Sequence, residues 1–196
     1  MFHKRIEKFI LFNNGQNETV PGTANGLPVN VTQPSNGSDA KISGIELSFQ
    51  HQLRSLPSPF DGLGFVTNVT FQSSAAETGI PYRLGKKVDF INAPERLWNV
   101  ALYYEKYGYE ARLAATHNGK FIEDFRTYAV DKWVQPRTQF DLKFSRKIGA
   151  HWRVYVEGQN LTNEHIYWTT NGPKISFQKD YTEVGTSYIV GLNWSL

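Results

Sequence analysis

The clearest alternation of hydrophobic and polar side chains lies within Gln135–Asn163. Two runs of period two flank a tight reversal at residues 147–150, and this pattern predicts an antiparallel β-hairpin. One face of the predicted hairpin carries Phe140, Leu142, Phe144, Trp152, Val154 and Val156, and the other carries Asp141, Lys143, Arg153 and Glu157. Because a dry core would reject these charges, the polar face is expected to meet water. The apolar face is then expected to meet either lipid or a second sheet.

The same period of two recurs along the rest of the chain. It predicts further strands over residues 1–12, 39–54, 63–73, 98–105, 109–116 and 187–196. Together with the hairpin these runs make eight strands, and no stretch predicts a helix.

The connections between the predicted strands alternate in length. Residues 55–62, 106–108 and 147–150 are short turns, whereas residues 13–38, 74–94, 117–134 and 164–184 are long and polar. Loops longer than about 12–15 residues are uncommon in compact domains. Short periplasmic turns alternating with long extracellular loops are typical of an outer-membrane barrel. The pattern therefore predicts an all-β fold, a segment of an antiparallel up-and-down transmembrane β-barrel.

The aromatic content, 14% of the chain, fits this fold. Tyr and Trp favour a membrane interface because their rings are apolar and their O–H and N–H groups seek water. Six such residues fall near the ends of predicted strands and are expected at the two interfaces: Trp98, Tyr104, Tyr109, Trp152, Tyr188 and Trp194. A soluble β-sandwich would instead bury them, but its strands would then carry too many polar partners.

Composition excludes several other classes of function. The net charge of +3 and the absence of a basic cluster argue against nucleic-acid binding. The chain has no cysteine, and its five histidines do not fall at metal-ligand spacing, so neither a metal nor a cofactor is expected. No Ser, His and Asp residues form a catalytic constellation, and the chain is not expected to be an enzyme.

Three segments carry a resemblance to a known family. They are QPRTQFDLKFSRKIGAHWRVYVEGQNLTNE from Gln135, AKISGIELSFQHQLRSL from Ala40 and APERLWNVALYYEKYGYEARLAATHN from Ala93. The first has an Asp early in one strand and ends the next strand with Asn160-Leu161-Thr162-Asn163. These elements resemble the C-terminal part of the barrel of TonB-dependent outer-membrane receptors. The chain departs from that family in closing on Leu196 rather than on an aromatic residue.

The resemblance implies a 22-stranded barrel filled by an N-terminal plug, with residues 1–196 as roughly its last third. The plug, the TonB box and the signal peptide would lie outside the sequence given. The implied partners are outer-membrane lipid, the plug, the TonB energy-transducing complex and a small-molecule ligand. The implied function is active transport of a scarce nutrient (a siderophore, a cobalamin or a carbohydrate) across the bacterial outer membrane, and residues 1–196 alone are expected to transport nothing.

Residues of the long connections are the candidates for ligand contact. Aromatic rings there suit stacking on a substrate, and basic side chains suit an anionic one. The candidates are Trp133, Tyr167, Trp168, Tyr181, Arg126, Lys132 and Lys174. Two other classes stay open: a complete eight-stranded outer-membrane barrel with a structural or adhesive role, and a soluble β-sandwich binding module.

Overall fold

The structure is a computed structural model in which almost every element is a β-strand. It describes residues 1–18, 29–80, 83–125, 130–171 and 176–195, with residues 12–18, 29–33 and 171 described by their backbone alone.

Eight strands form one antiparallel meander, which we call the wall. In spatial order they are β1 (Phe2–Glu7), β4 (Asp39–Gln52), β5 (Leu63–Glu77), β7 (Arg96–Lys106), β8 (Tyr109–Asn118), β11 (Arg137–Ile148), β12 (Trp152–Gln159) and β15 (Ser187–Trp194). The short strand β6 (Lys87–Val88) pairs with the end of β5. The wall is open, because β1 and β15 are its two edges and no pairing joins them within the described residues.

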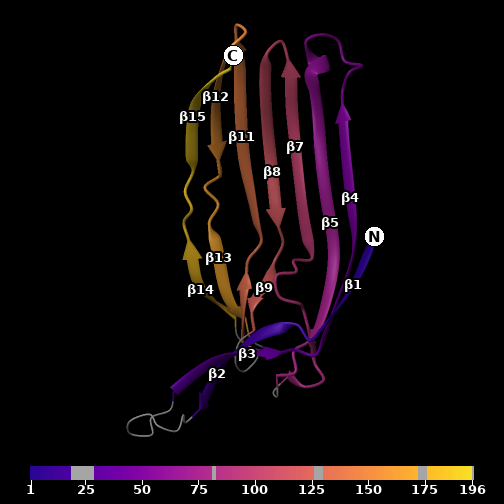
Figure 1. Ribbon diagram of the computed structural model, residues 1–196, viewed down its shortest axis with the longest axis vertical. Coiled ribbons are helices and arrows are strands. Elements are labelled where there is room, and N and C mark those ends of the chain that lie inside the picture. Colours follow the sequence, from indigo (N-terminus) through magenta and orange to yellow (C-terminus); the bar gives the residue numbers. More distant parts are fainter. Residues whose placement is uncertain (19–28, 81–82, 126–129, 172–175, 196) are drawn as a thin grey trace.

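The connections alternate in length as the sequence predicts. The turns β4–β5, β7–β8 and β11–β12 all lie at one end of the wall, together with the C-terminus (Figure 1). The first of these turns contains a short 3-10 helix, η2 (Phe60–Gly62). The long connections all lie at the opposite end. We call the two ends the short-turn end and the long-connection end.

The long connections contain strands of their own. Strands β2 (Ile10–Glu18) and β3 (Val29–Asn36) form a hairpin. A second group, which we call the crown sheet, has the order β14-β13-β10-β9. Its strands are β9 (Phe121–Asp124), β10 (Asp131–Val134), β13 (Ile166–Asn171) and β14 (Ser176–Thr182).

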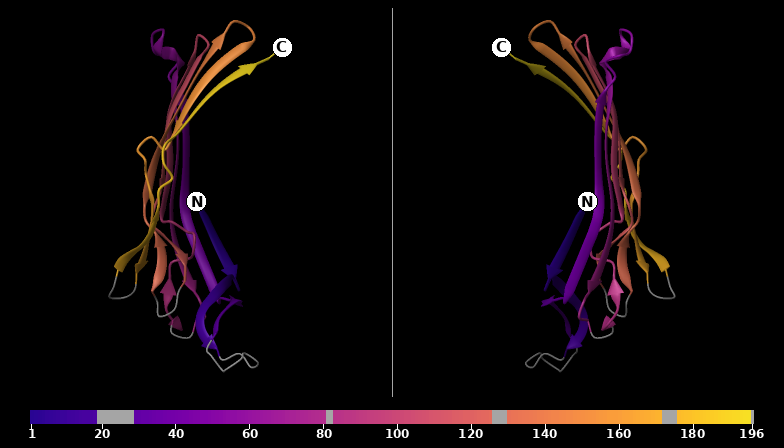
Figure 2. Two further views of the ribbon diagram at one scale, coloured as in Figure 1. Left: turned by 90° about the vertical axis from the view of Figure 1, so that its left-hand side faces the viewer. Right: turned by 90° about the vertical axis from the view of Figure 1, so that its right-hand side faces the viewer.

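The register of the wall keeps hydrophobic residues on one face from strand to strand. For example, Leu102 pairs with Leu113, and Leu113 pairs with Leu142. We call this side the apolar face; its exposed members include Ile45, Leu47, Phe49, Phe71, Val100, Leu102, Leu113, Phe140, Leu142, Phe144, Val154, Val156, Val190 and Leu192. The opposite side, the polar face, carries amides, hydroxyls and charges. Figure 2 shows that the wall is curved and strongly twisted.

The apolar face is not covered by a second sheet. Phe140 is 37% exposed, Val154 38%, Leu192 59% and Val190 76%. A soluble β-sandwich would bury these side chains between its two layers. The observed exposure therefore excludes the sandwich interpretation and leaves lipid as the medium that the apolar face suits.

The buried hydrophobic residues gather instead at the long-connection end. Their cluster consists of Phe9, Leu11, Ala40, Ala76, Ile80, Ile122 and Phe125. It joins the start of β2, the wall strands β4 and β5, and strand β9 of the crown sheet. This small core fixes the crown sheet to the wall.

The predicted element boundaries differ from the structure mainly in the long connections. The predicted strand over residues 1–12 is broken at Lys8, whose φ is 53°. Residues 13–38, 117–134 and 164–184 were predicted to be loops, which is wrong: they contain the β2–β3 hairpin and the crown sheet. These strands do not form part of the two-faced wall, so their sequences lack its regular alternation of apolar and polar residues. Strand β5 also runs on to Glu77, beyond the predicted end at Ser73.

Candidate functional site

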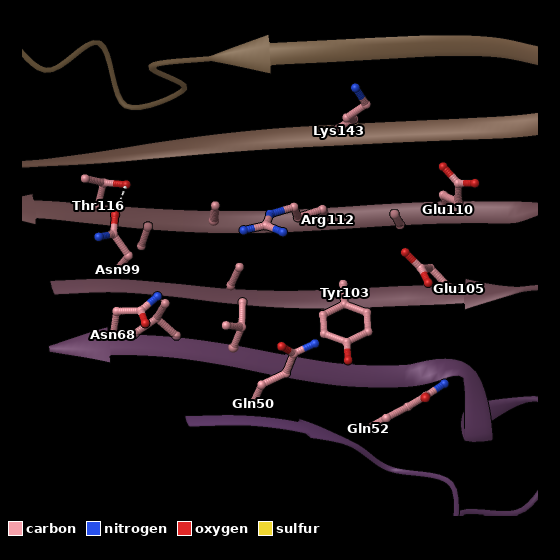
Figure 3. A pocket seen from close by; sticks show the side chains of 16 residues that line it. Gln50, Gln52, Asn68, Asn99, Tyr103, Glu105, Glu110, Arg112, Thr116 and Lys143 are labelled. Carbon is pink, nitrogen blue, oxygen red and sulfur yellow. Dashed lines mark hydrogen bonds between the residues drawn. The ribbon is translucent and has the colours of Figure 1, made fainter. Parts of the chain in front are cut away.

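The polar face of the wall contains a hollow of about 660 Å³. Figure 3 shows side chains from β4, β5, β7, β8 and β11 directed into it. Among its lining residues are Gln50, Asn68, Asn99, Tyr103, Arg112 and Lys143. Amide, hydroxyl and charged groups at this density suit water or a polar partner, because hydrocarbon would leave their hydrogen bonds unmade.

Charged residues of the polar face neutralise one another across strands. Lys143 forms an ion pair with Glu157, its register partner on β12. Arg153 pairs with Glu110, which also accepts a hydrogen bond of 3.1 Å from the Ser145 hydroxyl. Of the four charged residues that the alternation places on this face, Lys143, Arg153 and Glu157 form ion pairs across strands.

Arg112 differs from these residues. It is the register partner of both Tyr103 and Lys143, and it is directed into the hollow (Figure 3). Within the described residues Arg112 has no carboxylate partner, and its side chain is exposed. The hollow therefore presents a guanidinium that makes no direct ion pair, although Glu105 and Glu110 also line it.

One face of the crown sheet holds a compact group of three side chains. Glu123 accepts hydrogen bonds from the Trp168 indole, at 3.1 Å, and from Lys132. The Lys132 ammonium also lies 4.9 Å from the centre of the Trp168 ring. Burial acts to raise the pKa of Glu123, but the hydrogen bonds from Lys132 and Trp168 outweigh it and hold this pKa below its ordinary value.

A second aromatic group lies on the β13–β14 hairpin. Tyr167 and Tyr181 are register partners with ring centroids 6.1 Å apart and ring planes inclined by 27°. The His165 ring lies 6.0 Å from Tyr167 and 6.3 Å from Tyr181. Neighbouring residues of a strand point to opposite faces, so Tyr167 faces away from the side of Trp168.

Trp133 belongs to neither of these groups. Its neighbour Val134 pairs with Trp168, which places Trp133 on the opposite face of the crown sheet from Trp168. There it packs against the buried hydrophobic cluster, and the Lys120 ammonium lies 4.4 Å from its ring centre. Trp133 therefore contributes to the core of the long-connection end.

The six predicted interface aromatics all lie on the apolar face of the wall. Trp152 and Trp194 are register partners with centroids 6.4 Å apart, and Tyr104 and Tyr109 flank the neighbouring short turn. Tyr188 lies at the other end of β15, six residues before Trp194. At about 3.4 Å per residue this separation is roughly 20 Å along the strand. It is comparable to the apolar band of a membrane barrel, which is about 25 Å tall.

Trp98 lies near the long-connection end of β7, as Tyr188 does on β15. Its ring stacks on His117, its register partner on β8, with centroids 5.2 Å apart. The apolar face therefore carries aromatic residues toward both ends of the wall, with aliphatic residues such as Leu102 and Val190 between them.

The last wall hairpin is closed by Asp141 and Asn160. The Asp141 carboxylate accepts a hydrogen bond of 2.9 Å from the Asn160 backbone N–H. The Asn160 side chain, buried except for 3% of its surface, donates to the carbonyls of Glu164 and Gly185. It also accepts a hydrogen bond from the Glu164 N–H. These bonds fasten the ends of β11 and β12 to the segment that leads into β15.

The family model for the TonB dependent receptor-like β-barrel matches residues 1–161. The chain belongs to this family. No curated protein and no solved structure matches the chain.

TonB-dependent receptors are transporters of the outer membrane rather than enzymes, and the two-faced wall of this receptor chain agrees with that setting. Within the described residues no helix is long and apolar enough to cross a membrane. No group of three or more His, Cys, Asp or Glu side chains in the described part of the chain is arranged to hold a metal ion.

The receptor barrel brings only some of the predicted ligand candidates together. Tyr167 contacts Tyr181, and Lys132 contacts Trp168, but the two pairs are separate. Arg126 and Lys174 lie outside the described residues. The positive charge of Lys132 is compensated by Glu123.

Several residues beside the aromatic rings of the crown sheet could not be predicted from the sequence. Glu123, His165 and Glu183 stand in polar stretches without alternation, and only the pairing of the crown strands brings them beside aromatic rings. The buried ion pair of Arg83 with Asp131 was also missed, because 48 residues separate its members in the chain. No local signal in the sequence identifies these contacts.

Proposed function

We propose that this chain is part of the wall of an energy-coupled outer-membrane importer that takes up a scarce nutrient. The observation that carries the proposal is the opposite character of the two wall faces in a chain of the TonB-dependent receptor family. Hydrocarbon suits the apolar face, and the polar hollow suits a water-filled or plug-filled lumen. The nutrient class is a siderophore, a cobalamin or a carbohydrate.

The proposal includes an orientation. The short-turn end faces the periplasm, and the crown sheet and the β2–β3 hairpin face the exterior, because outer-membrane barrels have short periplasmic turns and longer outer loops. Ligand is captured at the long-connection end and passes the polar face when the plug moves. Trp133, Tyr167, Trp168, Tyr181, Arg126 and Lys132 are the proposed ligand contacts.

Residues 1–196 are proposed to be the C-terminal portion of a larger barrel. Open edges such as β1 and β15 leave backbone groups unpaired, which a membrane does not tolerate. Further strands on both sides satisfy these groups, and a plug and a TonB box belong to the same polypeptide. Residues 1–196 purified alone transport nothing into liposomes in this account.

The function is tested in cells that carry the gene with its natural flanking coding sequence. Deletion strains are grown with a ferric siderophore, cobalamin or a neutral oligosaccharide as the limiting nutrient, with TonB present or depleted. The expected result is a growth defect on one nutrient class that TonB depletion reproduces and gene restoration repairs. Uptake that is equal with and without TonB would contradict the proposal, and so would an absence of any defect.

A further inference from the structure

We propose that one face of the β13–β14 hairpin binds a neutral oligosaccharide. The face consists of His165, Tyr167, Tyr181 and Glu183, which we call the tyrosine platform. This inference rests on the proposed function and selects the carbohydrate among its nutrient classes.

The platform contains two neighbouring tyrosine rings that are accessible to solvent. Tyr167 and Tyr181 lie side by side on adjacent strands with nearly parallel rings, and they are 41% and 52% exposed. The His165 ring contacts both of them and is itself more covered, which supports the two tyrosines from one side. None of the three belongs to the buried cluster of this end of the molecule.

Such a surface suits the C–H face of a pyranose ring. The face of an aromatic ring is electron-rich, and the C–H groups of a sugar are weakly positive, so the two stack without requiring a charge. Two tyrosines at 6.1 Å present more area than one sugar ring covers, which favours an oligosaccharide over a monosaccharide.

A hydrogen-bonding group stands at the edge of the platform. The Glu183 side chain is 65% exposed, and its Oε1 lies 3.9 Å from Nδ1 of His165. A carboxylate accepts hydrogen bonds from two neighbouring hydroxyls, and such bonds are stronger than those between neutral groups. The aromatic rings therefore suit the C–H groups of a sugar, and the adjacent carboxylate suits its hydroxyl groups.

The distribution of charge argues against an anionic ligand here. Lys132 and Lys179 act on Glu123, which faces the other side of the crown sheet with Trp168. The charged groups of the platform itself are Glu183 and, when protonated, His165. A phosphate or carboxylate ligand would meet the Glu183 carboxylate, whereas a neutral polyol would not be repelled.

The test measures calorimetric binding to the full-length receptor that contains residues 1–196, in detergent micelles. The neutral probes are maltohexaose, cellohexaose, xylohexaose and mannohexaose, and the anionic probe is hexagalacturonate. We expect at least one neutral probe to bind. Tyr181→Ala should weaken that binding about tenfold or more by removing a stacking ring, whereas Tyr181→Phe should keep it within about threefold.

Matched variants locate the effect. Tyr107→Ala removes an exposed tyrosine at the short-turn end and should leave the affinity within about twofold, whereas Glu183→Gln should weaken it about threefold or more. If Tyr181→Ala fails to fold, Tyr181→Phe and Glu183→Gln decide. The inference is overturned if no neutral probe binds, if hexagalacturonate binds more tightly than all of them, or if binding survives the platform variants.

The outcomes separate this inference from the proposed function. TonB-dependent growth on a ferric siderophore without oligosaccharide binding would support the proposed function and refute oligosaccharide binding by the tyrosine platform. Oligosaccharide binding that needs Tyr181, combined with uptake that does not depend on TonB, would support the binding site and refute the proposed function.

Discussion

The Asp141 carboxylate accepts a hydrogen bond from the backbone N–H of Asn160, 19 residues later in the chain. The same carboxylate accepts a second bond from the Gln139 side chain at 2.9 Å. Asp141 therefore terminates β12 by capping a residue whose φ of 53° prevents the strand from continuing. This contact gives a physical reason why an Asp near the start of one strand occurs together with an Asn-Leu-Thr-Asn element at the end of the next strand.

Replacing Asp141 by alanine should destabilise the end of the hairpin. A hydrogen bond to a charged group contributes about 1.5–3 kcal/mol, and the Asn160 N–H would lose its partner. Urea unfolding followed by tryptophan fluorescence measures the loss. Thr162→Ala, at an exposed position of the same element, is the control and should change the stability by less than about 0.5 kcal/mol. Equal effects at the two positions would contradict the proposed role of Asp141.

Adjacent positions of β15 should respond oppositely to a charge. Val190 lies on the apolar face and Ile189 on the polar face, where it pairs with Glu157. In a lipid bilayer Val190→Arg should cost about 2–4 kcal/mol, since a charge on the lipid face is poorly solvated. Ile189→Arg should be tolerated beside Glu157. Comparison of urea unfolding in lipid vesicles tests both variants, and a larger loss for Ile189→Arg contradicts the assigned faces.

Two ion pairs of the chain should differ in their contributions to stability. The side chains of Arg83 and Asp131 are 2% and 9% exposed, whereas those of Arg153 and Glu110 are 35% and 44% exposed. Asp131→Asn removes the carboxylate charge that pairs with the buried Arg83 guanidinium and should cost about 3–5 kcal/mol. Glu110→Gln should cost no more than about 1 kcal/mol, because water screens the pair. The free energies of unfolding of the two variants decide, and similar losses contradict the prediction.

The crown sheet should become less stable in acid because of Glu123. Its pKa is below the ordinary value in the folded chain, so folding favours the charged carboxylate. The resulting stabilisation is complete above the pKa of the unfolded chain and is lost as the pH falls through the lower, folded pKa. The protection factors of the β9 and β10 amides against hydrogen exchange, which correct for the intrinsic pH dependence, should therefore fall over this interval.

Glu123→Gln should flatten the acid dependence of this exchange, because the variant keeps the side-chain shape but removes the titrating group. Glu77→Gln, on wall strand β5, is the control and should keep the dependence. An unchanged pH profile in Glu123→Gln would exclude Glu123 as the responsible group.

The wall could be predicted from the sequence because lipid and water impose a period of two on every strand. Val154 and Arg153, for instance, are neighbours with opposite character, and each lies on the face that its character predicts. The lengths of the connections then gave the order of the strands, since short turns join antiparallel neighbours.

The crown sheet could not be predicted because its strands form no comparable boundary between two media. The contacts of Trp133 with the buried cluster, for instance, depend on β10 pairing with β9 across a register shift between Lys132 and Trp133. Glu123 and Lys132 meet through that same irregular pairing. Such contacts depend on tertiary pairing rather than on a local pattern, and only the three-dimensional arrangement reveals them.

The most direct test of the account is a scan of side-chain environment along β12 and β15. The experiment uses the full-length receptor in lipid vesicles. Residues 1–196 contain no cysteine, so once any cysteine elsewhere is replaced, single cysteines can each carry one spin label at Arg153, Val154, Val156, Glu157, Ile189, Val190, Leu192 and Asn193. Labels at positions 154, 156, 190 and 192 should be accessible to oxygen in the hydrocarbon, and those at 153, 157, 189 and 193 to a water-soluble nickel complex. Alternation of this kind supports a membrane wall, whereas labels on the apolar face protected from both reagents would contradict it.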